Sequence, residues 1–142
     1  MESFQSSSAP LGIALLRVSL GVMWTAHALL KLLVFSLAGT AQYFESVGLA
    51  GVLAYPVFVA ELMGGFALLM GVYARQVALA LVPLMAVAAW VHVPNGWVHT
   101  SAGGGWEYPV FLIAASIALW LLGDGAAALK RSGWLVPKSR SA

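Results

Sequence analysis

The sequence predicts an all-α fold: a transmembrane four-helix up-down bundle. Two observations lead to this prediction. The 142 residues are 61% hydrophobic and 8% charged, whereas soluble domains carry about 25% charged residues. The apolar residues also gather in four stretches, each close to the 17 to 25 residues that a helix needs to cross about 30 Å of hydrocarbon. These stretches cover about residues 11–35, 52–72, 74–93 and 107–122.

The first stretch is expected to remain in the protein as a membrane helix after a short tail, residues 1–10. No lysine or arginine precedes it, Arg17 lies inside it, and it exceeds the apolar core of about 7 to 15 residues of a signal peptide. In the loop that follows, Thr40 is predicted to cap a short interfacial helix, with an apolar side made by Tyr43, Phe44 and Val47.

Prolines and glycines mark the limits of the later helices. Pro56 and Pro109 fall in first turns, where a missing N–H costs little, and Pro94 stops the third helix. Pro83 lies inside the third helix and is expected to kink it. The three consecutive glycines at 103–105 follow no phosphate-binding pattern, so they indicate a flexible turn.

The distribution of lysine and arginine predicts the orientation. With four spans, both termini and the turn between the second and third helices share one side. Five of the seven cations lie there: Arg75, Lys130, Arg131, Lys138 and Arg140. The two long loops contain none, so the positive-inside rule places both termini in the cytoplasm. The expected location is the bacterial cytoplasmic (inner) membrane, with a basic tail over residues 130–142.

Ionisable side chains interrupt the first two stretches. Arg17, His27 and Lys31 project from one half of the first helix at 100° per residue, and Glu61 lies near the middle of the second. A charge at the bilayer centre costs about 2.5 to 3.5 kcal/mol on insertion scales, so these groups should face inward and pair. At about 1.5 Å per residue, Arg17 is the nearest cation to Glu61, about 7 Å away in depth. An Arg17–Glu61 pair is therefore predicted.

Close helix packing is suggested by small residues four positions apart, a spacing typical of membrane helix contacts. The pairs are Gly21 with Thr25, Ala60 with Gly64, and Ala74 with Ala78.

The candidate site is an intramembrane polar cluster in the middle and outer half of the bundle. Its members are Arg17, Trp24, His27, Lys31, Glu61, His92 and Glu107. A quinone carbonyl needs hydrogen-bond donors beside an apolar wall, and Trp24, His27 and Lys31 could supply them. Other interpretations stay open: Arg17–Glu61 could be a structural pair, Lys31 could snorkel to the interface, and the groups at the outer loop could be hydrated.

Several kinds of chemistry are disfavoured. The chain has no cysteine, which excludes disulfides, thiolate nucleophiles and iron–sulfur ligation within it. The histidine spacings match no zinc motif, so no metal site is predicted. The serines lie mostly near the two ends, with no arrangement that supports a catalytic triad. The formal charge of +2 comes from too few groups to suggest nucleic acid binding.

A set of short motifs, in order over roughly residues 11–129, resembles the DoxX family of small four-helix membrane proteins. They are Arg17 with Gly21, His27 with Lys31, Phe44 with Gly48, "AELMGGFALLMGVYAR" from Ala60, "HVPNG" from His92, "GGWEYP" from Gly104, and "GDG" from Gly123. The tail departs from the family pattern, because "AAALKR" stands where relatives often have a polar run with an aspartate. No site is assigned to this tail.

The resemblance implies a fold more strongly than a function. Some relatives are membrane subunits of quinone-linked oxidoreductases, and many have no assigned activity. The leading hypothesis is therefore a membrane subunit of a quinone-linked oxidoreductase system that offers a quinone or partner site, with soluble redox enzymes as partners. No independent catalytic centre is visible. The alternative is a non-enzymatic scaffold or a small-solute permease. Substrate and oligomeric state stay open, and a homo-oligomer is compatible with the sequence.

Overall fold

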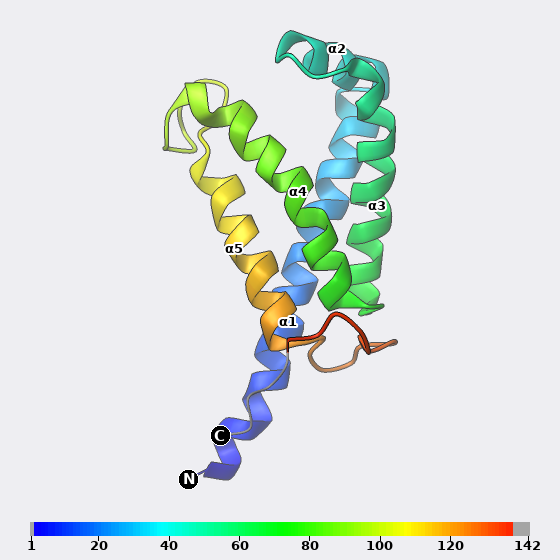
Figure 1. Ribbon diagram of the computed structural model, residues 1–142, viewed down its shortest axis with the longest axis vertical. Coiled ribbons are helices and arrows are strands. Elements are labelled where there is room, and N and C mark those ends of the chain that lie inside the picture. Colours follow the sequence, from blue (N-terminus) through cyan, green and yellow to red (C-terminus); the bar gives the residue numbers. More distant parts are fainter. Residues whose placement is uncertain (1, 138–142) are drawn as a thin grey trace.

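The computed structural model describes residues 2–137 and is all-helical (Figure 1). Its elements are α1 (Glu2–Leu29) with a π-helical extension (Leu30–Val34), α2 (Leu37–Ser46), a 3-10 turn (Gly51–Leu53), α3 (Ala54–Met70), α4 (Ala74–His92), a 3-10 turn (Val93–Asn95) and α5 (Glu107–Leu122). Within these described residues, β-pairing is limited to an isolated bridge between Val72 and Lys130.

Three helical segments are long and apolar enough to cross a membrane: Ser8–Val34, Gly51–Met70 and Ala74–Asn95. The apolar helix α5, Glu107–Leu122, is shorter, with a length of about 24 Å at 1.5 Å per residue.

The predicted helix limits hold for α4 and α5, but two details were wrong. The first helix begins at Glu2, well before Leu11. The predicted interfacial helix is present as α2, yet Thr40 does not cap it. Ser36 does, because its hydroxyl accepts a hydrogen bond from the Gly39 N–H at 3.0 Å, while the Thr40 hydroxyl donates to the Ser36 carbonyl.

The long helices form two antiparallel pairs, α1 with α3 and α4 with α5 (Figure 1). The pairs lie close together at one end of the molecule and diverge toward α2. Small residues bring α1 and α3 together: a Cβ added at Gly65 would lie 2.7 Å from the Thr25 backbone nitrogen, and one at Gly21 would lie 2.9 Å from the Leu69 nitrogen. Gly64 faces the other way, toward Leu81 of α4.

At the closed end, polar side chains bind the unpaired groups of helix termini. The Arg75 guanidinium donates to the carbonyls of Trp120 and Leu121 at the end of α5. In return, Asp124 accepts from the Arg75 backbone N–H at the start of α4. Asp124 also accepts from the N–H and the hydroxyl of Ser132. These bonds attach residues 123–137, which we call the C-terminal strap. Residues 138–142 of the predicted basic tail lie outside the described residues.

Candidate functional site

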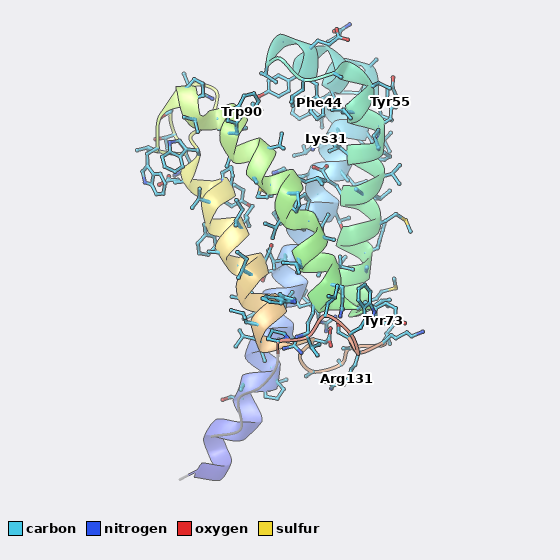
Figure 2. All side chains as sticks on the ribbon, viewed as in Figure 1. Lys31, Phe44, Tyr55, Tyr73, Trp90 and Arg131 are labelled. Carbon is cyan, nitrogen blue, oxygen red and sulfur yellow. The ribbon has the colours of Figure 1, made fainter. Side chains whose placement is uncertain are left out.

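The divergence of the two helix pairs leaves one large cleft at the α2 end, with a volume of about 1540 Å³. Its walls come from α1, α3, α4 and α5, and α2 contributes Thr40, Tyr43 and Phe44. In Figure 2, Phe44 lies at the α2 end of the molecule, above Lys31. Six of the seven predicted site residues line this cleft: Trp24, His27, Lys31, Glu61, His92 and Glu107. The sequence therefore identified most of the polar groups of a single cavity.

The carboxylate of Glu61 pairs with Lys31. The ammonium of Lys31 lies 2.7 Å and 3.0 Å from the two carboxylate oxygens, and Glu61 is only 6% exposed. Removing two charges from water is costly, and their attraction offsets this cost only with good geometry. Here both oxygens accept from one ammonium, whose third N–H remains to be used. The acid that hydrocarbon would reject is thus sheltered between helices α1 and α3.

The predicted Arg17–Glu61 pair was wrong, and the register of α1 and α3 explains the error. Gly21 packs beside Leu69 and Thr25 beside Gly65. Arg17 therefore lies at the C-terminal end of α3, while Glu61 is level with the residues just after His27. The separation along the helix axes is about 18 Å at 1.5 Å per residue. Lys31 is the cation within reach of Glu61.

Arg17 instead binds backbone at the closed end of the molecule. Its guanidinium donates to the carbonyls of Leu68 and Leu69, at 3.0 Å and 3.2 Å, and to that of Ala126 at 2.9 Å. The first two carbonyls belong to the last turn of α3, where orphan acceptors and the negative end of the helix dipole favour a cation. Arg17 is therefore part of the packing and outside the cleft.

Trp24 is one of the residues that line the cleft, and its indole nitrogen is a buried donor without a partner among the described residues. Trp24 is 2% exposed, and within the described part of the chain its Nε1–H has no hydrogen-bond partner. A buried donor without an acceptor costs about 1 to 3 kcal/mol. An acceptor that reached this N–H would remove the cost.

Two histidines of the cleft wall share one arrangement. The Nδ1 atom of His27 lies 2.8 Å from the Met23 carbonyl, and that of His92 lies 2.7 Å from the Ala88 carbonyl. A carbonyl only accepts, so in each hydrogen bond Nδ1 carries the proton, and in the neutral ring Nε2 is an acceptor. The ring of His27 is also roughly parallel to that of Tyr108, with centroids 6.5 Å apart. Sequence reasoning did not single out Tyr108 as part of the site, since nothing in the sequence pairs it with α1.

The outer edge of the cleft carries a second ionic contact. Glu107, the first residue of α5, accepts hydrogen bonds from the backbone N–H and the Nδ1 of His99, both at 2.7 Å. His99 is largely exposed, so this contact is accessible to solvent. Hydrated groups at the outer loop were one of the interpretations left open by the sequence. Among the side chains that the structure describes, no group of three histidine, aspartate or glutamate residues is arranged to hold a metal ion.

Comparison with known proteins assigns the chain to a family. No solved structure matches it at a significant level. A Bacillus subtilis (strain 168) protein named "Putative oxidoreductase CatD" is 32% identical over 124 residues, which cover 87% of this chain and 88% of that protein. The sequence model of the DoxX family matches residues 12–94. The chain is a membrane protein with apolar helices, and it belongs to the DoxX family.

Proposed function

We propose that this protein is the membrane subunit of a quinone-linked oxidoreductase system and that its cleft receives a quinone headgroup. The unpartnered Trp24 N–H is the observation that carries this proposal. A quinone presents carbonyl oxygens that only accept, so one of them would satisfy the indole. The volume of about 1540 Å³ exceeds the 300 to 1000 Å³ or so of an ordinary ligand pocket, which leaves room for part of an isoprenoid tail.

The chain's own residues would bind the quinone and exchange protons. Reduction of a quinone takes up two electrons and two protons. Trp24 would hold one carbonyl oxygen, and the free N–H of Lys31 would approach the headgroup. The Nε2 atoms of His27 and His92 would take up protons from water and pass them to the two oxygens of the reduced quinone. With no cysteine in the chain, thiol chemistry cannot supply the electrons. A soluble redox enzyme is the partner that this function requires.

The membrane arrangement that fits this function has four spans. The three long apolar segments would cross the bilayer together with α5, in the cytoplasmic membrane of a bacterium. The two loops at the α2 end lack lysine and arginine, whereas the strap carries Lys130 and Arg131. By the positive-inside rule both termini are cytoplasmic, so the cleft lies in the outer half of the membrane.

The relative's name supports the reaction class. The Bacillus subtilis protein is named as an oxidoreductase and aligns over most of both chains. Quinone as the electron carrier rests on the cleft chemistry of the present chain.

The test compares Trp24→Phe with Trp90→Phe in the purified protein. Trp24→Phe keeps an aromatic ring and removes the N–H, whereas Trp90 lies outside the cleft lining and serves as the matched control. Binding of ubiquinone-1 and of a short-chain menaquinone would be measured by isothermal titration. Loss of one hydrogen bond to a buried donor should weaken binding about tenfold in Trp24→Phe, while Trp90→Phe should match the wild type. Failure of both quinones to bind the wild type, or equal binding by both variants, would refute the proposal.

A further inference from the structure

The C-terminal strap presents an apolar and basic surface on its outer side. Leu129, Trp134 and Leu135 are 74%, 57% and 63% exposed. Lys130 and Arg131 are exposed between them. Lys138 and Arg140 follow in the sequence, and residues 125–142 contain no acidic residue.

This surface is held in place by bonds made through the strap's backbone. The N–H groups of Leu129 and Lys130 donate to the carbonyls of Met70 and Gly71, and the Lys130 carbonyl accepts from the Tyr73 N–H. The indole N–H of Trp120 donates to the Leu135 carbonyl at 2.9 Å, and the side-chain amide of Gln76 donates to the carbonyl of Trp134. The backbone is thus fixed, while the large apolar side chains point away from the protein.

These hydrogen-bond partners show where the strap lies along the helix axes. Met70 is the last residue of α3 and Tyr73 precedes α4, so the strap crosses the ends of two apolar helices. Tyr73 and Arg131 lie together at this end of the molecule, opposite Lys31 (Figure 2). The neighbouring ends of α3 and α5 expose Met70, Leu121 and Leu122, so the apolar surface of the strap continues the lipid-facing surface of the helices. Tryptophan and leucine beside cations at this depth are typical of the membrane–water boundary.

We infer that the outer surface of the C-terminal strap binds anionic phospholipid headgroups of the leaflet on its side of the membrane. Trp134 and Leu135 insert at the level of the glycerol backbone, and Lys130 and Arg131 contact the phosphates. A basic residue near an anionic leaflet contributes about 1 kcal/mol, which corresponds to roughly a fivefold preference per cation. This binding site is separate from the cleft and does not depend on the quinone proposal.

The test measures lipid retention by the full-length protein in native mass spectrometry, from micelles with equal phosphatidylglycerol and phosphatidylcholine. The wild type should retain phosphatidylglycerol preferentially. Lys130→Gln/Arg131→Gln should reduce the preference roughly fivefold for each cation removed, whereas the matched swap Lys130→Arg/Arg131→Lys should preserve it. Both variants should fold, because the strap is attached by backbone groups at Lys130, and circular dichroism would verify this.

Two further measurements on the wild type require no substitution. Raising the salt concentration to 1 M should reduce the preference, since the Debye length falls to about 3 Å, and free glycerol 3-phosphate should not compete. Equal retention of the two lipids, an unchanged preference in the glutamine variant, or competition by glycerol 3-phosphate would overturn the inference. Labelling of Lys130 with amine reagents gives one more test. The inference would be overturned if a soluble protein in native membranes protected Lys130 from the reagent and phosphatidylglycerol nanodiscs did not.

Discussion

Lys31 and Glu61 form an ion pair in which the carboxylate is buried and the ammonium is partly exposed. Neither would be stable alone between apolar helices, and together they satisfy each other through two short contacts. A buried pair of this kind is weak evidence for stability in itself, because well-packed apolar residues often serve as well. The pair is therefore informative mainly through its location in the wall of the cleft.

Glu61→Gln tests this view of the pair. The substitution leaves the Lys31 ammonium, whose side chain is 17% exposed, without a counter-charge. We expect a loss of about 3 kcal/mol in the free energy of unfolding, near the lower end for a broken buried pair. Thermal and denaturant unfolding in detergent would measure it.

The matched control removes both charges. Lys31→Met/Glu61→Met should recover most or all of the lost stability, and a double-mutant cycle gives the coupling between the two residues. Wild-type stability in Glu61→Gln would contradict the burial of this pair. If the double variant is stable but no longer binds quinone, the pair serves ligand binding and not stability.

Asp124 contributes a pH dependence at the strap. Its burial raises the pKa of the carboxyl, but the hydrogen bonds from Ser132 and from the Arg75 backbone outweigh burial, and the net pKa is below the ordinary value of 3.8. A depressed pKa in the folded state means that the carboxylate stabilises the fold above the unfolded pKa, and that this stabilisation is lost as the pH falls through the folded pKa.

We expect the contact between Asp124 and Ser132 to hold from pH 7 to about 4 and to weaken as the pH falls further, through the lowered pKa of the folded state, while the backbone bonds at Leu129 and Lys130 remain. Hydrogen exchange at the N–H of Ser132, which donates to Asp124, would report the change after correction for intrinsic rates. Asp124→Asn should expose this amide at every pH. Loss of protection near pH 6 in the wild type would mean that another group holds the strap.

At the scale of elements, the packing of α1 on α3 sets which charges can meet. Gly21 and Gly65 let the two backbones approach until Thr25 lies against Gly65, and this register leaves Arg17 at the end of α3 and Glu61 beside Lys31. The close approach is therefore a precondition for the charge pair as well as for packing.

Gly65→Ala should destabilise the protein, because the added Cβ would lie 2.7 Å from the Thr25 backbone nitrogen. Overpacking of this kind costs about 1 to 3 kcal/mol. Gly12→Ala is the matched control: it is also in a helix, and nothing lies within 4 Å of the added Cβ, so helix propensity should make it neutral or stabilising by up to about 1 kcal/mol. Unfolding in detergent distinguishes the two. Equal stabilities would show that α1 and α3 separate at little cost.

Helix limits could be predicted from the sequence where proline and length determine them. Pro94 ends the α4 segment, and Pro109 falls in the first turn of α5 as expected. The α1–α3 register could not be predicted, because the relative depth of residues on two helices depends on how the helices pack, and α1 begins at Glu2, well before Leu11. The small-residue pattern at Gly21 and Thr25 did indicate a contact surface, but its partner is Gly65, one position from the predicted Gly64.

The candidate site, too, could be predicted only in part from the sequence. The sequence was sufficient to identify most of the histidine, lysine and glutamate residues that line the cleft, because ionisable groups in apolar helices seldom face lipid. The role of Asp124 was missed, although an acid between Gly123 and Gly125 just after a helix is a signal for a loop that binds backbone. Arg17 was assigned to the site because sequence alone does not show which helix end a cation reaches.

At the scale of the whole molecule, stability and binding are separated along the helix axes. At the closed end, Arg17, Arg75 and Asp124 form hydrogen bonds with the backbone at helix termini. The strap binds to the same end. The opposite end is open, and its cleft carries an ion pair and an indole without an acceptor. Strong attachment at one end allows the helix pairs to diverge at the other.

The membrane arrangement that follows can be tested with single cysteines, because the chain has none. Thr100 is exposed in the loop before α5, and Gly133 is exposed in the strap with open space around an added Cβ. In bacterial spheroplasts, a membrane-impermeant maleimide should label Thr100→Cys directly and Gly133→Cys only after permeabilisation. The reverse pattern would place the cleft in the cytoplasmic half. Between Thr100 and Gly133 the chain contains a single helix, α5. Labelling of both positions from the same side would therefore mean that this shorter helix does not cross the bilayer.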